Sequence, residues 1–515
     1  MSANPFPRPV NFPSRGWLLT ALAAVLWLAG LWFFTRHNDF PIYYHPDEGS
    51  KGEQIVSGEL NFHHPLLLLD TAKLILRIMG KSVTVENAVH AGRMASAIFA
   101  ASSVVLLAAL AWRVGGWKAG LLAALLVGVH PLLYELAHYC KEDPALLLGL
   151  SAGMLMLDVF LARPSLARAV GLGAACGLAA SGKYLGIVLL PIVVTVLIVR
   201  FRSDKKRLAS LLGVCLVGFA AVVAVINLPY LLEPAALKRG LSYELHAAQL
   251  GGNKGLSRDV PHDKYLGVFL NNLSWPLWAG LALFACDRLL RKKGSRTVCL
   301  LLLVFPLAYA LLISFSPKTA SRYFLAVSPF LILAASIGIA GIGGFFPQRW
   351  KRWRIVSTAF GVALAVVAQR DLFIPSWNGF QGDSRREMSG WMNENLSPNT
   401  LLLAETRIHL SKLPTWSGMR REDLQIEEGP FLPDFGTSSE MRAKGVGTVA
   451  TIRTSFGGFM DEKRKPVKSL EEQHRRRATF YRNLFAKGRL LHKTGGSGVG
   501  ILNPEIRLYE LPLAD

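Results

Sequence analysis

Residues 141–161 read KEDPALLLGLSAGMLMLDVFL and show the pattern that decides the fold of this 515-residue chain: a short charged connection followed by an apolar run. A membrane-spanning helix needs roughly 20 predominantly apolar residues to cross about 30 Å of hydrocarbon, and residues 144–161 are close to that length. Hydrophobic residues make up 51% of the chain and charged residues 18%, with a mean hydropathy of +0.33. This composition excludes a disordered chain and argues against a soluble nucleic-acid binder, despite the net charge of +22.

Apolar segments of similar length recur, and together they predict a polytopic α-helical membrane protein. Eleven segments qualify as spans: residues 16–35, 92–112, 118–134, 144–161, 168–182, 184–200, 208–228, 266–286, 297–315, 323–345 and 354–372. Lys and Arg concentrate in short cytoplasmic loops, and they crowd the connections 200–207, 288–296 and 349–354. These loops place the N-terminus in the cytoplasm and, with an odd number of spans, the C-terminus outside. The first span is expected to remain as an anchor, since no small-residue cleavage site follows it.

The last part of the chain has a different composition. Residues 373–515 are polar, rich in Arg and Glu, and without a spanning stretch. Their pattern predicts helices over 385–396 and 471–485, and strands over 400–404, 447–453 and 506–511. We therefore expect two domains: a transmembrane domain over residues 1–372 and a soluble α/β domain over residues 373–515, on the outer face of the membrane.

Acidic residues follow the first predicted span. The outer loop there contains His45, Asp47 and Glu48, and later His64. Two adjacent carboxylates at a membrane boundary can act as a general base or hold a metal ion. The alternative is a solvated turn in which both acids face water.

A second charged group, Lys141, Glu142 and Asp143, stands directly before the fourth span. Asp143 followed by Pro144 is also a favourable helix start, because Asp caps a helix and Pro suits its first turn. Helix capping does not explain why two acids and one cation share so short a connection.

Basic residues occupy two other predicted outer turns. Lys183 lies between the fifth and sixth spans, and Lys318, Arg322 and Tyr323 lie at the start of the tenth. Arg is suited to bidentate binding of phosphate, and Lys pairs with it as a point charge. The alternative is that these side chains snorkel to lipid headgroups. Carboxylates and phosphate-binding cations on one face suit an acid–base reaction on an anionic donor held in the membrane.

These motifs resemble the GT-C glycosyltransferases, in particular the branch shared by protein O-mannosyltransferases and the bacterial transferases that add aminoarabinose to lipid A. The matching stretches are His45–Glu48, His63–Leu66, Lys141–Leu146, Ser181–Tyr184 and Arg322–Leu325. The likeness covers residues 16 to about 345, and Asn503–Leu511 resembles the closing strand of the outer domain in such proteins.

The resemblance implies an inverting transfer of one sugar from a polyprenyl-phosphate donor to an acceptor at the outer membrane face. It places Asp47 near the acceptor hydroxyl with Glu48 beside it, and either carboxylate is a candidate for the base. Lys183, Arg322 and Lys318 are the candidates for binding the donor phosphate. Supporting, acceptor-side or metal-side roles are left for His45, His64, Lys141, Glu142, Asp143 and Tyr323. Asp47, Glu48 and Asp143 are candidate ligands of a divalent cation, Mg²⁺ or Mn²⁺, although no ligand spacing is specific enough to assert one.

Two other functions remain open. A transporter or flippase of a lipid-linked precursor would have internal repeats and polar residues deep in its spans, whereas the polar residues here cluster at the outer ends. A non-catalytic membrane scaffold would tolerate the loss of the Asp47 carboxylate. The expected partners are a polyprenyl-phosphate-linked sugar, a lipid, glycan or protein acceptor, and membrane lipids, with no nucleic acid. The expected location is a bacterial inner membrane, with the C-terminal domain in the periplasm.

Overall fold

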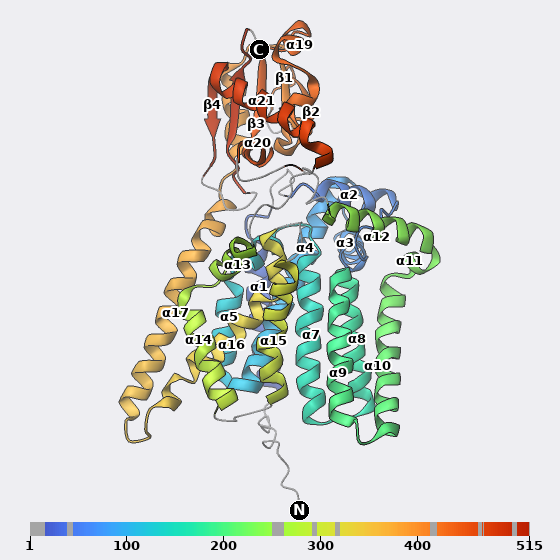
Figure 1. The fold of residues 1–515 in the computed structure, drawn as a ribbon, viewed down its shortest axis with the longest axis vertical. Coiled ribbons are helices and arrows are strands. Elements are labelled where there is room, and N and C mark those ends of the chain that lie inside the picture. Colours follow the sequence, from blue (N-terminus) through green and yellow to red (C-terminus); the bar gives the residue numbers. More distant parts are fainter. Residues whose placement is uncertain are drawn as a thin grey trace, which may run out of the picture.

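The computed structural model describes residues 16–38, 45–249, 262–290, 296–314, 320–412, 420–461, 466, 468–496 and 502–513. Most of the first 380 residues form a bundle of helices with roughly parallel axes, and the C-terminal sheet lies beyond one end of it (Figure 1). Every predicted span overlaps a helix or a pair of helices in this bundle. The chain is thus a multi-pass helical membrane protein, as the sequence predicts.

The helices of the bundle differ widely in length. They are α1 (Gly16–Thr35), α4 (Val85–Gly115), α5 (Trp117–Gly128), α6 (Pro131–Ala137), α7 (Asp143–Ala162), α8 (Leu166–Gly182), α9 (Leu189–Phe201), α10 (Lys205–Ile226), α13 (His262–Asn271), α14 (Trp275–Ala285), α15 (Arg296–Ser314), α16 (Ser328–Ala340) and α17 (Lys351–Gly379). Within the described residues, six segments are long and apolar enough to cross a membrane, or seven if α5 and α6 form one bent span. The predicted count of eleven spans therefore stays a prediction.

One predicted span, residues 118–134, is broken into α5 and α6, whose axes differ by 61°. The break lies at His130, which has extended backbone angles and precedes Pro131. Proline disfavours the helical conformation in the residue before it and lacks the N–H that would continue the ladder. The bend leads α6 directly into the charged connection of residues 138–142.

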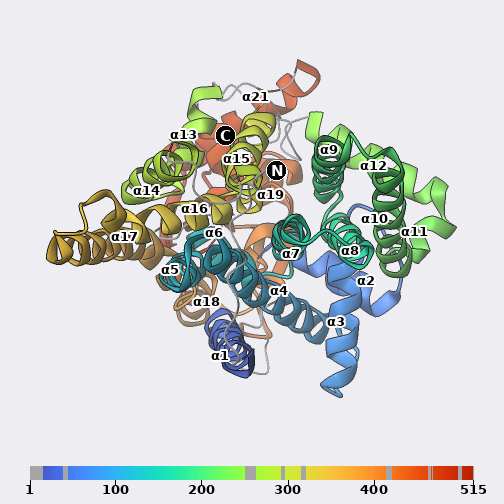
Figure 2. The same ribbon diagram turned by 90° about the horizontal axis from the view of Figure 1, so that it is seen from below.

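Small residues let α7, α8 and α10 pack closely. The three helices lie side by side in this order, as the view along their axes shows (Figure 2). A side chain at Gly149 on α7 would come within 2.2 Å of the Ala179 backbone on α8, and one at Gly173 on α8 within 1.8 Å of the Cys215 carbonyl oxygen on α10. Glycine at these two positions is what permits the contact, as in many membrane helix pairs.

Short helices lie across the end of the bundle that faces the C-terminal sheet. They are α2 (Glu48–Ser57), α3 (Leu67–Ile78), α11 (Leu228–Leu232) and α12 (Pro234–Gln249). α3 is amphipathic: Leu68 and Leu76 are buried, whereas Leu74 and Ile78 are exposed. The basic connection between α9 and α10 and the basic start of α17 lie at the opposite end of the bundle (Figure 1).

The C-terminal part is an α/β unit built on a five-stranded sheet of order β2-β1-β3-β5-β4. The strands are β1 (Leu401–Glu405), β2 (Gln425–Gly429), β3 (Thr448–Ile452), β4 (Arg489–Thr494) and β5 (Ile506–Glu510), with helices α18 (Ser384–Asn395), α19 (Ser438–Ala443), α20 (Arg453–Met460) and α21 (Glu471–Lys487). β1 pairs in parallel with β2 and β3, and β5 pairs antiparallel with β3 and β4. The three predicted strands and both predicted helices are confirmed as elements.

α17 joins the two parts of the chain. Its last turn contacts α6 and the connection after it: Ser376 Oγ donates to Glu135 at 2.7 Å, and the Phe380 ring lies 4.3 Å from the His138 ring. Phe380 also belongs to a buried cluster that continues into the C-terminal unit at Ile408, just after β1, and at Ile452 on β3. The predicted domain boundary after residue 372 lies within α17 and stays a prediction.

Candidate active site

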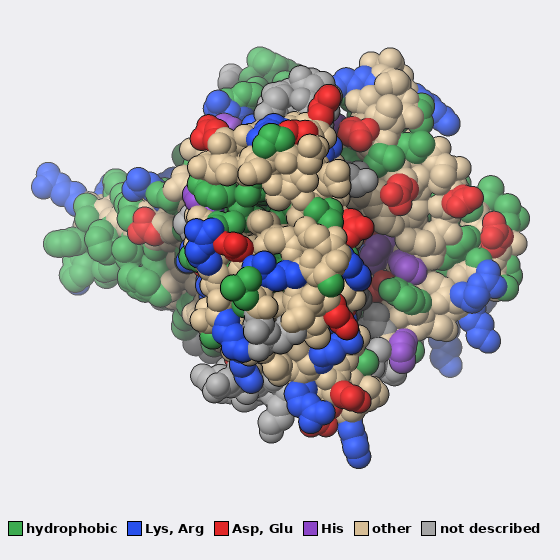
Figure 3. Space-filling model, turned by 90° about the horizontal axis from the view of Figure 1, so that it is seen from above, with side chains coloured by type: hydrophobic (Ala, Val, Ile, Leu, Met, Phe, Trp, Pro, Cys, Tyr) green, Lys and Arg blue, Asp and Glu red, His purple; other side chains and the backbone are tan. Residues whose placement is uncertain are grey.

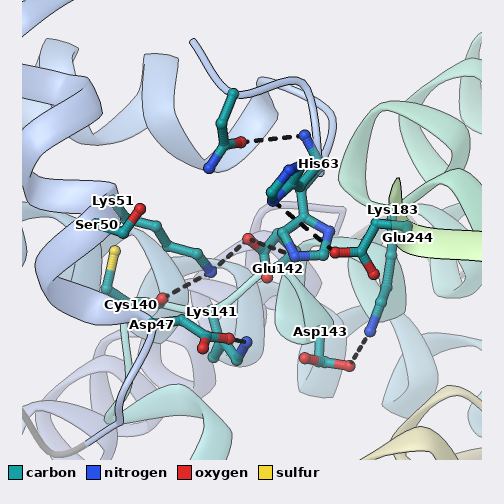
Figure 4. Close-up of polar contacts among 12 residues, drawn as sticks. Asp47, Ser50, Lys51, His63, Cys140, Lys141, Glu142, Asp143, Lys183 and Glu244 are labelled. Carbon is teal, nitrogen blue, oxygen red and sulfur yellow. Dashed lines mark hydrogen bonds and ion pairs between the residues drawn. The ribbon is translucent and has the colours of Figure 1, made fainter. Parts of the chain in front are cut away.

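The candidate residues gather at the end of the bundle that faces the C-terminal sheet. They come from the connection before α2, from α2 itself, from the α6–α7 connection, from the end of α8 and from the 3-10 helix η3 (Ser321–Ala326). Figure 4 shows Asp47, Lys51, Lys141, Asp143 and Lys183 pointing into one region. We call the nine charged side chains described below the site network: Asp47, Glu48, Lys51, Arg93, Lys141, Glu142, Asp143, Lys183 and Arg322.

Asp47 lies at the N-terminus of α2, and its carboxylate forms an ion pair with Lys141 Nζ. His45 Nδ1 lies 3.6 Å from the same carboxylate, and 45% of the Asp47 side chain is exposed. Burial acts to raise the pKa of Asp47, but Lys141 and His45 outweigh it and hold the pKa well below its usual range. Asp47 is therefore an ionised carboxylate that a substrate can reach.

Lys141 is buried, and Ser96 fixes its backbone: the Ser96 hydroxyl donates to the Lys141 carbonyl at 3.1 Å. Burial lowers the pKa of Lys141 to about 8, and the neighbouring cations Lys51 and Arg322 act in the same direction, while Asp47 acts against them. Lys141 is thus a cation that can lose its proton only slightly above neutral pH.

Glu48 points away from Asp47 into the protein and is fully buried. Arg93 Nε and Nη2 bind its two oxygens at 3.1 and 2.9 Å, and the backbone N–H groups of Cys140 and His45 donate to it at 2.8 and 3.2 Å. Burial would raise the pKa of Glu48, but Arg93 and these N–H groups lower it overall. The carboxylate is fully occupied by protein partners.

Sequence reasoning missed Arg93 and Lys51. Arg93 lies on α4, where an arginine inside a predicted span is itself a signal of function or structure. Lys51 lies one turn into α2 and offered no comparable signal. Its ammonium group pairs with Glu142 and donates to the Cys140 carbonyl at 3.1 Å.

Glu142 also faces His64, whose Nε2 lies 3.9 Å from Oε1. Burial lowers the pKa of His64 to about 4, although Glu142 acts in the opposite direction. His64 is therefore neutral near pH 7, and Glu142 has Lys51 as its cationic partner. Glu142 Oε2 is buried and has no hydrogen-bond partner among the described residues.

Asp143 and Lys183 form a second, largely buried ion pair of the network. Lys183 Nζ lies 2.7 Å from Asp143 Oδ1 and 5.2 Å from the Tyr323 ring centroid. Arg322 Nη1 lies 3.1 Å from His45 Nε2, and its guanidinium lies 5.6 Å from the Tyr323 ring centroid. The Tyr323 ring thus lies close to both predicted phosphate-binding cations. Asp143 Oδ2 and Arg322 Nε are buried without a partner in the described part of the chain.

The first outer loop is tied to helices far along the chain. The Tyr184 hydroxyl donates to the Phe62 carbonyl at 3.1 Å, and the Tyr230 hydroxyl donates to the His64 carbonyl. Asn227 accepts from the Leu66 N–H at 3.0 Å and donates to Ser181 at 2.8 Å. These bonds fix the loop over the ends of α8 and α10.

The predicted phosphate ligand Lys318 lies outside the described residues. Within the described residues, no group of three or more His, Cys, Asp or Glu side chains is placed to hold a metal ion. Each of the suggested metal ligands Asp47, Glu48 and Asp143 instead faces a cation of the protein. We derive no step through a metal.

Positive and negative side chains are mixed on the end of the molecule that carries the C-terminal domain. Seen from the end that carries the C-terminal domain, Lys and Arg side chains alternate with Asp and Glu, and histidines lie in a hollow beside that domain (Figure 3). The mixture differs from the one-signed basic surfaces that bind nucleic-acid backbones.

The chain is a multi-pass membrane protein whose fold is similar to that of the GT-C glycosyltransferases. Residues 63–226, which carry Lys141, Glu142, Asp143 and Lys183, match the family model of dolichyl-phosphate-mannose-protein mannosyltransferases. Among functionally curated proteins no significant match was found.

Solved structures with the same fold include ArnT from Cupriavidus metallidurans. In its apo state it matches with a TM-score of 0.50 and 16% identity, covering 96% of this chain and 98% of ArnT. ArnT bound to undecaprenyl phosphate matches with a TM-score of 0.49 and 16% identity over 98% and 99% of the two chains. The S. cerevisiae protein O-mannosyltransferase Pmt1-Pmt2 complex bound to the sugar donor matches with a TM-score of 0.36 and 17% identity, over 43% of this chain and 34% of that one. The resemblance seen in the sequence is confirmed at the level of the fold.

Proposed function

We propose that the chain is an inverting glycosyltransferase that moves one sugar from a polyprenyl-phosphate donor to an acceptor at the outer face of the cytoplasmic membrane. The observation that carries this proposal is that a half-exposed, ionised Asp47 and the cations Lys183 and Arg322 belong to one network: His45 contacts both Asp47 and Arg322, and Lys183 pairs with Asp143. The match of residues 63–226 to a polyprenyl-phosphate-sugar-dependent family supports the donor class.

In the proposed reaction, the acceptor hydroxyl attacks the anomeric carbon of the sugar while the bond from that carbon to the phosphate oxygen breaks. Asp47 takes the hydroxyl proton. The ion pair with Lys141 makes Asp47 a weak base, but the proton becomes far more acidic as the new carbon–oxygen bond forms, so a weak base suffices. A single displacement inverts the anomeric carbon and needs no covalent enzyme intermediate.

The leaving group is the lipid phosphate, whose negative charge grows in the transition state. Preorganised cations in a water-poor site stabilise such charge far better than water does. Lys183 and Arg322 fill this role, and both lie close to the Tyr323 ring. Glu48, whose oxygens are all occupied, holds Arg93 and the connection at Cys140 in place.

We also infer that the N-terminus lies in the cytoplasm and the C-terminal domain outside. The basic connection between α9 and α10 lies at the end of the bundle remote from the site network, which supports this orientation.

The activity is tested with full-length protein in liposomes that contain a panel of polyprenyl-phosphate sugars and extracted membrane lipids, glycans and proteins. Mass analysis of the products should show one donor consumed and one acceptor increased by the mass of a single sugar. If folded protein consumes no donor in any combination, the proposed function is wrong.

Replacement of Lys183 with Ala is expected to raise the Michaelis constant for the donor about 10- to 100-fold, with a smaller change in kcat. A hydrogen bond to a charged group contributes about 1.5–3 kcal/mol, and about 1.4 kcal/mol corresponds to tenfold in binding. Lys183→Arg, which keeps the charge beside Asp143, serves as the control and should retain most of the affinity. An unchanged Michaelis constant in Lys183→Ala would favour the reading in which this lysine only snorkels to headgroups.

The pH dependence of the reaction should follow the loss of the proton from Lys141. As the pH rises through about 8, Lys141 loses its proton, and the site network loses one of its five positive charges, which weakens its attraction for the donor phosphate. We therefore expect kcat/KM for the donor to fall above pH 8, measured between pH 6 and 10. Lys141→Arg should move this fall to higher pH, because Arg stays charged. A profile that is flat through pH 9 in the wild type would contradict this role.

A further inference from the structure

The C-terminal sheet presents the ends of its parallel strands to the site network. β3 ends at Ile452, which pairs with Ile506 at the start of β5. Asn503, just before β5, donates to the Gly379 carbonyl at the end of α17 at 3.1 Å. The end of β3, and with it the end of the neighbouring parallel strand β1, therefore lies next to the bundle. In open α/β sheets, ligands bind at this edge, beyond the carboxyl ends of the strands.

Arg407 stands at this edge, two residues after β1. One of its N–H groups donates to the Thr454 carbonyl, which follows β3, at 3.1 Å. The nearby Glu405 is committed elsewhere: it accepts from the Tyr481 hydroxyl, from Thr451 Oγ1 at 2.8 Å and from the Ile452 N–H at 2.8 Å. Arg407 forms no ion pair with a carboxylate among the described residues, so most of its donors remain available.

Arg407 is also within electrostatic range of the candidate base. Burial lowers the pKa of Arg407, and the charges of Glu405 and Asp47 act on it in the opposite direction. A cation carried by the C-terminal domain, at the end of the sheet that lies next to the bundle, is thus close enough to the exposed carboxylate of Asp47 to feel its charge.

The charges of the site network are balanced by one bound donor, so Arg407 needs an anion of its own. The network contains five cations and four anions, so the single negative charge of a phosphodiester donor balances it. Arg407 then remains without a counter-charge once the donor is bound. Isolated charges in partly buried sites are costly unless they are paired, and guanidinium groups bind phosphate and carboxylate in a bidentate manner.

We propose that Arg407 binds a phosphate or carboxylate group that a membrane-held acceptor carries close to its reacting hydroxyl, so that the C-terminal domain supplies part of the acceptor site. The inference rests on the proposed function. A membrane-held acceptor is favoured because α3 and α12 flank the site and expose Leu74, Ile78, Leu241 and Leu245, as helices lying in a membrane interface do.

The test uses full-length wild type, Arg407→Gln and Arg407→Lys in liposomes, with the polyprenyl-phosphate sugar that the wild type consumes. The acceptors are a glycolipid with a phosphate monoester and the same glycolipid after phosphatase treatment. Arg407→Gln removes the charge but keeps an N–H donor, and Arg407→Lys keeps the charge without the planar guanidinium. Arg475→Gln, an exposed arginine on α21 of the same domain, is the matched control.

Arg407→Gln should raise the Michaelis constant for the phosphorylated acceptor about 10- to 100-fold and leave that for the phosphatase-treated acceptor and the binding of undecaprenyl phosphate within twofold. Arg407→Lys should recover part of the loss, and Arg475→Gln should behave as the wild type. Equal losses with both acceptors, or weaker undecaprenyl phosphate binding, would show a structural role and overturn the inference. An unchanged Arg407→Gln beside an active wild type overturns this inference alone, whereas a wild type without transfer overturns the proposed function as well.

Discussion

Asp47→Asn is expected to lower kcat for sugar transfer by about 10²- to 10⁴-fold, the usual contribution of a positioned general base. Asn is nearly the same size but accepts no proton. The side chain is half-exposed at the start of α2, so water can compensate part of the charge lost beside Lys141, and the fold should depend on Asp47 less than on a fully buried ion pair. The measurement is the initial rate of product formation with donor and acceptor both saturating, together with the melting temperature in detergent.

The neighbouring acid Glu48 serves as the comparison for the Asp47→Asn experiment. Asp47→Asn should lower the melting temperature less than Glu48→Gln does and leave the affinity for the donor close to that of the wild type. A variant that keeps full kcat would remove Asp47 from the reaction, and a variant that is inactive because it no longer folds would be recognised by its melting temperature.

Glu48→Gln is expected to destabilise the protein strongly, by about 3–5 kcal/mol, because it leaves Arg93 as a buried charge without its partner. Both side chains are almost completely buried, and the Glu48 carboxylate also accepts from the Cys140 and His45 backbones. The change should appear as a lower melting temperature and a lower yield of folded protein. Activity per folded molecule should fall much less than in Asp47→Asn.

A double replacement tests whether Glu48 is the structural partner of Arg93 or the catalytic base. When Glu48→Met is combined with Arg93→Met, no buried charge remains, and stability should recover relative to either single variant. A Glu48→Gln protein that melts like the wild type but has lost its kcat would instead identify Glu48 as the base.

Much of the fold follows from local patterns in the sequence, and the exceptions have local causes. Each apolar run became a helix, because backbone groups in a membrane must be bonded within the segment. The break at His130 was missed because the apolar run continues through Pro131. Strands β2 and β4 were missed because they are partly exposed edge strands rich in charged residues.

The site could be predicted as a set of residues but not as a set of pairs. Lys141, Asp143 and Lys183 stood out as charges at membrane boundaries, and they do meet. Their partners depend on tertiary contacts: Asp47 pairs with a residue 94 positions away, and Glu48 with one 45 positions away. Arg407 could not be recognised, because nothing in its own segment indicates that the sheet edge turns toward the bundle.

α17 leads from the membrane bundle to within a few residues of the C-terminal unit, whose first helix begins at Ser384, so its helical phase helps to set the rotation of one part relative to the other. Each residue added to a helix turns everything beyond it by about 100° and advances it by about 1.5 Å. A one-residue insertion near the middle of α17 would therefore swing the Arg407 edge away from Asp47 while leaving both parts folded, and four added residues would nearly restore its direction. Grafting a foreign outer domain onto this bundle consequently requires matching the helical phase as well as the length of the junction.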